Sequence, residues 1–138
     1  MSKISTYLSF DGTAAEAMRF YEGALNAKLD VLVKSGDVPN AKPPANADRV
    51  VHAQLSFQDG GVLMASDRIG GQPYGGMKGF SVALSYGSAD EARRAFDALS
   101  DGGVVTMPLQ PSFFAETFGM VIDRFGAPWM ITGGTKQG

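Results

Sequence analysis

The chain has 138 residues and 14.5 kDa, and its 44% hydrophobic and 19% charged residues suit one globular domain built of two small halves. Its 12 Lys and Arg against 14 Asp and Glu leave no basic surplus for nucleic acid, and the absence of Cys excludes disulfide scaffolds and thiol chemistry. With no apolar run of about 20 residues and no signal-peptide core, we expect a cytoplasmic protein without a membrane partner.

The first half of the chain predicts one helix among several strands. Thr13 and Glu16 have the spacing of a capping box, in which hydroxyl and carboxylate satisfy free N–H groups at a helix start. Further strands are predicted at 29–33, 50–57 and 61–66, and the stretch 35–48 is predicted to be a long exposed loop. Apolar residues with helical spacing follow the capping box: Ala14, Ala17, Met18, Tyr21, Ala24 and Leu25.

The second half repeats this order, offset by about half the chain from Gly12 to Gly87. Ser88 and Glu91 form a second capping box, and Gly102 and Gly103 end the second helix. Each half therefore has the order βαβββ, and neither could bury much core alone. We predict an α+β fold with a first module at 1–67, a linker at 68–79 and a second module at 80–138. The strands after the second helix are predicted at 104–107, 115–122 and 128–132.

Nearly the whole chain is similar to a known family, at 7–12, 17–21 and 51–55 and most specifically at 107–110, 118–121 and 123–131, whereas 35–48 and 68–79 are the weakly similar regions. These segments resemble PhnB-like proteins of the vicinal oxygen chelate superfamily, the glyoxalase/bleomycin-resistance/dioxygenase fold. The resemblance implies a curved mixed sheet with a cleft and an intertwined homodimer. It implies no reaction. The names used in the family suggest phosphonate metabolism or methyl transfer to demethylubiquinone, but the chain lacks a Gly-rich strand-to-helix turn for S-adenosylmethionine, which argues against a methyltransferase.

The resemblance also implies where a metal would be bound. Metal-using members of the superfamily hold it with four side chains, usually His or Glu, on the first and last strand of each module. Carried over by motif, these positions fall at Ser5, Met64, Ser81 and Met130. Hydroxyls and thioethers do not hold Fe²⁺, Ni²⁺ or Zn²⁺ tightly, so we expect no metal and no other cofactor.

Strand alternation places mixed polar and thioether side chains on the sheet face opposite the helices. Such a lining suits a small, moderately apolar organic ligand, although a water-exposed sheet face has the same pattern. Phe114 joins the set through the resemblance, near the cavity mouth or a dimer contact. The predicted ligand-binding residues are Ser5, Tyr7, His52, Gln54, Met64, Ser66, Ser81, Phe114 and Met130.

His52, the only His, is the one catalytic candidate, as a general base or a hydrogen-bond anchor. The lack of a paired carboxylate favours the alternative, a half-exposed strand histidine bonded to a neighbour. Asp67 either bonds a ligand together with Ser66 or serves as a turn or helix cap. Two functions follow. The first is metal-independent binding of a small organic molecule. The alternative is a lyase, isomerase or dioxygenase that uses a metal not placed here or His52 as its base.

Overall fold

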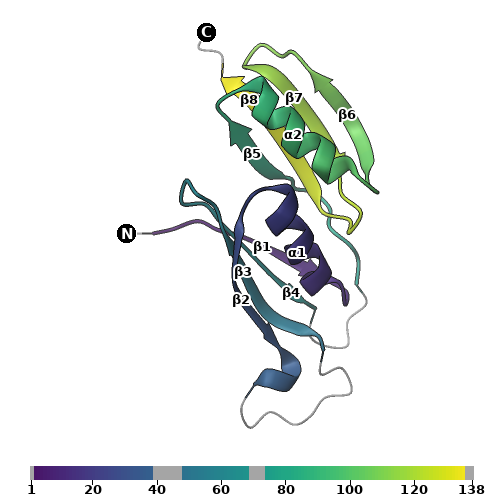
Figure 1. Cartoon of the computed structure of the whole chain (residues 1–138). Helices are drawn as coiled ribbons and strands as arrows, with labels where there is room; N and C mark the ends of the chain where they lie inside the picture. Colours follow the sequence, from purple (N-terminus) through teal and green to yellow (C-terminus); the bar gives the residue numbers. More distant parts are fainter. Residues whose placement is uncertain (1, 39–47, 69–73, 136–138) are drawn as a thin grey trace. The chain divides into compact units, whose positions relative to one another are not determined.

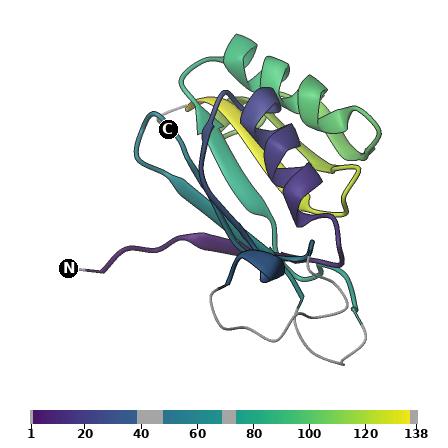
Figure 2. The same cartoon turned by 60° about the horizontal axis from the view of Figure 1, so that its bottom comes forward.

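The computed structural model describes residues 2–38, 48–68 and 74–135, and it divides the chain into two compact units, Met1–Gly76 and Met77–Gly138. Each unit has one four-stranded sheet and one long helix that lies on one face of that sheet (Figures 1 and 2). The predicted α+β fold of two βαβββ modules is confirmed. No helix in the described ranges is long and apolar enough to cross a bilayer.

The first unit has a mixed sheet in the order β1-β4-β3-β2. β1 runs parallel to β4, and the other two pairs are antiparallel. Of the predicted loop at 35–48, Ser35–Asp37 form a short 3-10 turn, and 39–47 lie outside the described residues. The elements are β1 (Thr6–Phe10), α1 (Ala14–Ala24), β2 (Lys28–Lys34), β3 (Val50–Ser56) and β4 (Val62–Asp67).

The second unit repeats this topology in the order β5-β8-β7-β6, again with its first and last strands parallel. β6 and β8 extend three residues beyond the predicted strands. β6 runs through Pro108, which the edge position tolerates, and the pairing register shifts between Met107 and Gln110. The elements are β5 (Val82–Tyr86), α2 (Ala89–Ser100), β6 (Val104–Gln110), β7 (Ala115–Ile122) and β8 (Pro128–Thr135).

The core of the first unit lies between α1 and the sheet. Alternate residues of β1, β3 and β4 are buried against the helix, and the residues between them face the other way. Ala53 and Ala65 are paired on adjacent central strands, and their small side chains let α1 come close. The other buried residues of this layer include Leu8, Phe10, Val50, Leu55 and Leu63 from the sheet and Ala14, Ala17, Met18 and Tyr21 from α1.

The start of α1 is held by a carboxylate from the opposite end of the unit's sequence. Thr13 makes no side-chain capping hydrogen bond, so the predicted first capping box is wrong. Instead, Asp67 at the end of β4 accepts hydrogen bonds from the backbone N–H groups of Gly12 at 2.8 Å, Ala14 at 3.0 Å and Val50 at 2.9 Å. Asp67 is only 2% exposed. Its alternative interpretation as a cap is therefore right.

The start of α2 is capped from within the helix. The hydroxyl of Ser88 accepts from the N–H of Glu91 at 3.2 Å and donates to its carboxylate at 3.0 Å. The sheet position that corresponds to Asp67 is Gly133, which pairs with Tyr86 as Asp67 pairs with Phe10. A Cβ at Gly133 would lie 2.5 Å from the carbonyl oxygen of Ser88. Because α2 lies directly on β8 there, it has to supply its own cap.

The hairpin between β7 and β8 is organised by a second buried carboxylate. Asp123, 3% exposed, accepts from the N–H groups of Phe125 at 2.8 Å and Ala127 at 3.1 Å with one oxygen. Its other oxygen accepts from the indole Nε1–H of Trp129 at 2.7 Å. This segment carries much of the family resemblance, and the hydrogen bonds of Asp123 stabilise the turn within the segment itself.

We expect the two helix starts to respond differently to loss of the hydroxyl. Ser88→Ala should lower the free energy of unfolding by about 1 kcal/mol, the usual cost of losing an N-cap. Thr13→Ala should leave it nearly unchanged, because Asp67 satisfies the start of α1. Urea denaturation of the two variants measures both values. Equal losses would show that Thr13 does cap α1.

We expect Asp67→Asn to cost about 3 kcal/mol of stability, because an amide gives up the charge-assisted bonds and turns an NH₂ group toward a backbone N–H. Asp97→Asn, on the exposed side of α2, is the matched control and should change little. A loss below about 1 kcal/mol for Asp67→Asn in the same denaturation assay would contradict the assigned role.

Candidate functional site

The candidate site is the face of the first unit's sheet that points away from α1. One row of side chains crosses all four strands, because Tyr7 on β1 is opposite Met64 on β4, Met64 is opposite Gln54 on β3, and Gln54 is opposite Val31 on β2. Strand alternation adds Ser66 and His52 to the same face. Five of the nine predicted residues therefore share this face: Tyr7, His52, Gln54, Met64 and Ser66.

Tyr7 and His52 contact each other on this face and are here called the Tyr7–His52 pair. The hydroxyl of Tyr7 lies 3.5 Å from Nδ1 of His52, and the two rings are stacked with their centroids 5.9 Å apart. Because β4 lies between β1 and β3, the pair spans that strand. Tyr7 is 47% exposed and His52 is half-buried, so a ligand can reach both.

The strand positions around the pair are uncharged. Val33 on β2 is opposite His52, and Met64 and Ser66 lie on β4, the strand that the pair spans. The nearby ionic cluster is separate: at the end of β1, Asp11 binds Arg49 at 2.9 Å and lies 3.5 Å from Arg68. The hydrogen bond from Arg49 lowers the pKa of the Asp11 carboxyl.

The other predicted residues lie elsewhere. Ser5 precedes β1 and is exposed. Ser81, half-buried just before β5, belongs to the second unit, as do the two remaining residues. Phe114, between β6 and β7, lies edge-on to Phe113 and to Phe118, each with ring centroids 5.2 Å away.

Met130 belongs to a feature that sequence reasoning missed. Met107 on β6 is opposite Met120 on β7, which is opposite Met130 on β8, so three thioethers form a methionine row across adjacent strands. All three are half-buried. Strand alternation marks each of them singly, but only the pairing register shows that they are neighbours.

The four positions carried over from metal-using relatives do not fit a divalent metal. Met64 has Tyr7 and Gln54 as its cross-strand neighbours, and Met130 has Ala83 and Met120. None of these four cross-strand neighbours carries a carboxylate or an imidazole that could replace the thioether as a ligand. Within 2–38, 48–68 and 74–135, no three His, Cys, Asp or Glu side chains lie close enough together to hold a metal ion.

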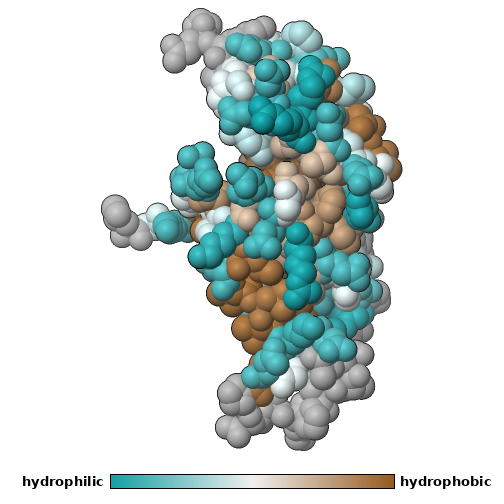
Figure 3. All heavy atoms as spheres, in the orientation of Figure 1, coloured by the Kyte–Doolittle hydropathy of each residue, from teal (hydrophilic) through white to brown (hydrophobic). Residues whose placement is uncertain are grey.

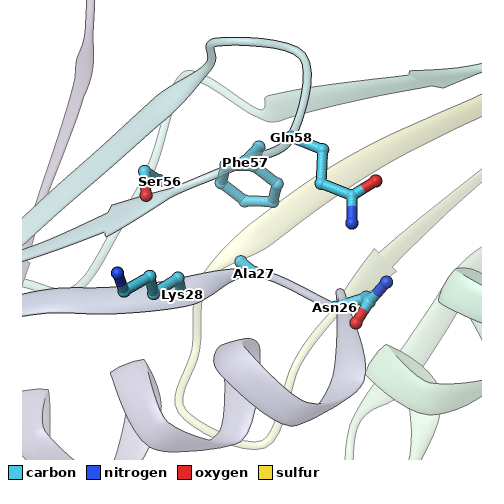
Figure 4. Close-up of a pocket in the computed structure, with 6 residues that line it drawn as sticks. All are labelled: Asn26, Ala27, Lys28, Ser56, Phe57 and Gln58. Carbon is cyan, nitrogen blue, oxygen red and sulfur yellow. The ribbon is translucent and has the colours of Figure 1, made fainter.

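A surface pocket of about 390 Å³ lies at the other end of the same sheet, where β2 begins and β3 ends (Figure 4). Most of its lining side chains are polar, whereas ligand pockets of this size are usually lined mainly by apolar groups. None of the predicted site residues lines it, so the sheet face remains the better candidate. Its lining residues are Asn26, Ala27, Lys28, Ser56, Phe57 and Gln58.

Comparison with known proteins agrees with this architecture. The family model described as 3-demethylubiquinone-9 3-methyltransferase matches residues 2–132. The chain belongs to this family. It is similar to the solved structure of protein PA1353 from Pseudomonas aeruginosa, with 41% identity over 96% of this chain and 98% of that one and a TM-score of 0.89.

Two further structures support the family and the fold. A PhnB protein from Bacillus cereus has 25% identity over 96% of this chain and 99% of its own, with a TM-score of 0.77. A glyoxylase/bleomycin resistance protein/dioxygenase domain from Frankia shares the fold at 16% identity, covering 100% of this chain and 95% of that one with a TM-score of 0.71. The PhnB-like resemblance and the vicinal oxygen chelate fold are thus confirmed.

We expect Zn²⁺, Ni²⁺ or Fe²⁺ to leave the melting temperature unchanged. A tight metal site would raise it, because metal that binds the folded state stabilises that state by mass action. Met64→Glu combined with Met130→Glu tests the carried-over positions, since the double variant should gain metal-dependent stabilisation. Differential scanning fluorimetry measures both. A clear rise in the melting temperature of the native protein on addition of metal, abolished by His52→Ala, would contradict the expected lack of a metal site.

Proposed function

We propose that the protein binds a small organic ligand without a resident metal, on the open face of the first unit's sheet. The observation that carries the proposal is the Tyr7–His52 pair on an uncharged face. Two rings that a ligand can stack on lie there beside the amide of Gln54 and the thioether of Met64. This combination offers apolar contact together with a few oriented hydrogen bonds, as small-molecule sites do.

Binding is better supported than catalysis by His52. A catalytic imidazole is usually oriented by a third group, most often a carboxylate. Among the residues that the structure describes, the only hydrogen bond to the His52 ring comes from Tyr7. Asp67, at the end of β4, has both oxygens bound to backbone N–H groups on the helix side of the sheet. The proposal therefore assigns no proton transfer, and it includes no methyl transfer.

A fragment screen by ligand-observed NMR tests the proposed face. We expect hits to be small aromatic molecules that carry a hydrogen-bonding group, and their binding to shift the imidazole resonances of His52, the only His. Gln54→Ala should weaken them about fivefold, the cost of one hydrogen bond. Gln58→Ala, in the surface pocket, is the matched control. If Gln58→Ala weakened the binding of the hits and Gln54→Ala did not, the ligand would bind in the surface pocket and the proposed face would be wrong.

We further propose that the chain forms a homodimer. Apolar side chains gather over β2 and along β6, which are edge strands of their sheets (Figure 3). On β6, Val104 is 62% exposed and Val105 is 43% exposed. An open strand edge with exposed apolar side chains favours pairing with another chain, and a second copy is the partner always present.

Light scattering at micromolar concentration should give twice the 14.5 kDa of one chain. Val104→Lys combined with Val105→Lys places charges on the β6 edge and should shift the mass toward one chain if that edge takes part. The mass of a single chain for the native protein would contradict the dimer.

A further inference from the structure

We propose that the surface pocket between the start of β2 and the end of β3 binds a neutral sugar ring. The pocket has a volume of about 390 Å³, and neither residue of the Tyr7–His52 pair lines it, so this inference goes beyond the proposed function. It follows from the kinds of side chain that line the pocket and from the two turns that hold them there.

One wall of the pocket is the end of α1. The helix ends in a Schellman motif, in which the N–H of Ala27 donates to the carbonyl oxygen of Glu22 at 3.1 Å. The motif has a left-handed residue just before Ala27, and Asn26 has a φ of 53° there. Glycine is the usual residue at this position, and asparagine is sometimes found instead. Asn26 therefore adds an amide side chain at a point where hydrogen bonds fix the backbone.

The opposite wall is the turn between β3 and β4. The N–H of Phe57 donates to the carbonyl oxygen of Gly61 at 2.9 Å, and its own carbonyl oxygen accepts from the N–H of Gly60 at 3.0 Å, which closes the turn. Gln58 follows Phe57 in this turn. The amides of Gln58 and Asn26 lie at the same end of the pocket (Figure 4).

The other end of the pocket is formed by Lys28 and Ser56 (Figure 4). These two residues are opposite each other in the pairing of β2 with β3, so their side chains leave the sheet on the same face. The ring of Phe57 and the methyl group of Ala27 lie between the two ends. The pocket therefore has polar groups at both ends and a short apolar stretch between them.

This arrangement matches a sugar ring. An amide has an acceptor oxygen and an NH₂ donor, and a sugar hydroxyl both donates and accepts, so neighbouring hydroxyls of one ring can bond to one amide. The C–H groups on the face of a sugar ring pack against the negative face of an aromatic ring, which Phe57 supplies. Within 2–38, 48–68 and 74–135, the side chains of Asn26, Lys28 and Gln58 have no hydrogen-bond or ionic partner, so they are available to a ligand.

The charges around the pocket favour a neutral sugar over an acidic one. Among the six lining residues, only Lys28 is charged. The carboxylate of Glu22 accepts from the N–H of Leu29, the residue after Lys28, and Asp59 follows Gln58 in the turn. Two acidic residues thus flank one cation, and we expect Lys28 to donate a hydrogen bond to a hydroxyl without selecting an anion.

Methyl glycosides of glucose, galactose and mannose test the inference, with tetrahydropyran-2-methanol as a probe that keeps the ring and lacks the ring hydroxyls. Each is titrated into isotope-labelled protein up to millimolar concentrations, and the backbone amide resonances are followed by NMR. At least one glycoside should cause saturable shifts at residues 26–28 and 56–58. Tetrahydropyran-2-methanol should bind about tenfold more weakly or less, because each lost hydrogen bond costs about fivefold in affinity.

Two variants remove the amides one at a time. Asn26→Gly keeps the left-handed backbone, because glycine adopts a positive φ without strain, so the helix end stays intact. Asn26→Gly and Gln58→Ala should each weaken glycoside binding about fivefold, the cost of one hydrogen bond. Gln110→Ala, which removes an exposed amide on β6, is the matched control and should leave the affinity unchanged.

The inference is overturned if no glycoside causes saturable shifts at these residues, or if tetrahydropyran-2-methanol binds as tightly as the glycosides. Glycoside binding that neither Asn26→Gly nor Gln58→Ala weakens would place the sugar elsewhere. Glucuronate binding about tenfold tighter than methyl glucoside would assign the pocket to an anion, since charge-assisted hydrogen bonds are the stronger ones. None of these outcomes decides the proposed function, whose test follows the imidazole resonances of His52.

Discussion

The carboxylate of Asp67 is the constraint on which the first unit depends. It joins the turn before α1, the first residue of that helix and the first residue of β3 to the end of β4. Because alternate residues of a strand point to opposite faces, anchoring Asp67 on the helix side places Met64 and the buried Ser66 on the other face of the sheet. The side chains of β4 that face the candidate site are therefore fixed by an interaction on the opposite side of the sheet.

The two units solve the same problem with different chemistry. Both must satisfy the free N–H groups of a helix that packs on the last strand. The first unit places a carboxylate at that strand position, whereas the second has Gly133, and α2 comes so close that no side chain fits. Thr13 and Ser88 occupy equivalent positions in the two repeats but have different roles, because the residue on the last strand that faces each helix start differs.

Patterns along the chain predicted the modules, the turns and the faces of the strands, since periodicity and glycine turns are local properties. Alternation alone placed Tyr7, His52 and Gln54 on one face. What it could not predict was register, and register puts Tyr7 within reach of His52 across β4 and aligns the methionine row. The segment around Asp123, where the family resemblance is most specific, has residues that stabilise its own turn, so the resemblance there says little about activity.

The methionine row has a consequence for the chemical durability of the second unit. In a chain without Cys, half-buried thioethers are the groups that peroxide attacks first. Met120 lies between Met107 and Met130, so a sulfoxide on Met120 would place a strong dipole against both of the other thioethers. An oxidised molecule would thus carry a polar, chiral strip where the reduced one has a soft apolar surface, and methionine sulfoxide reductases could reverse the change.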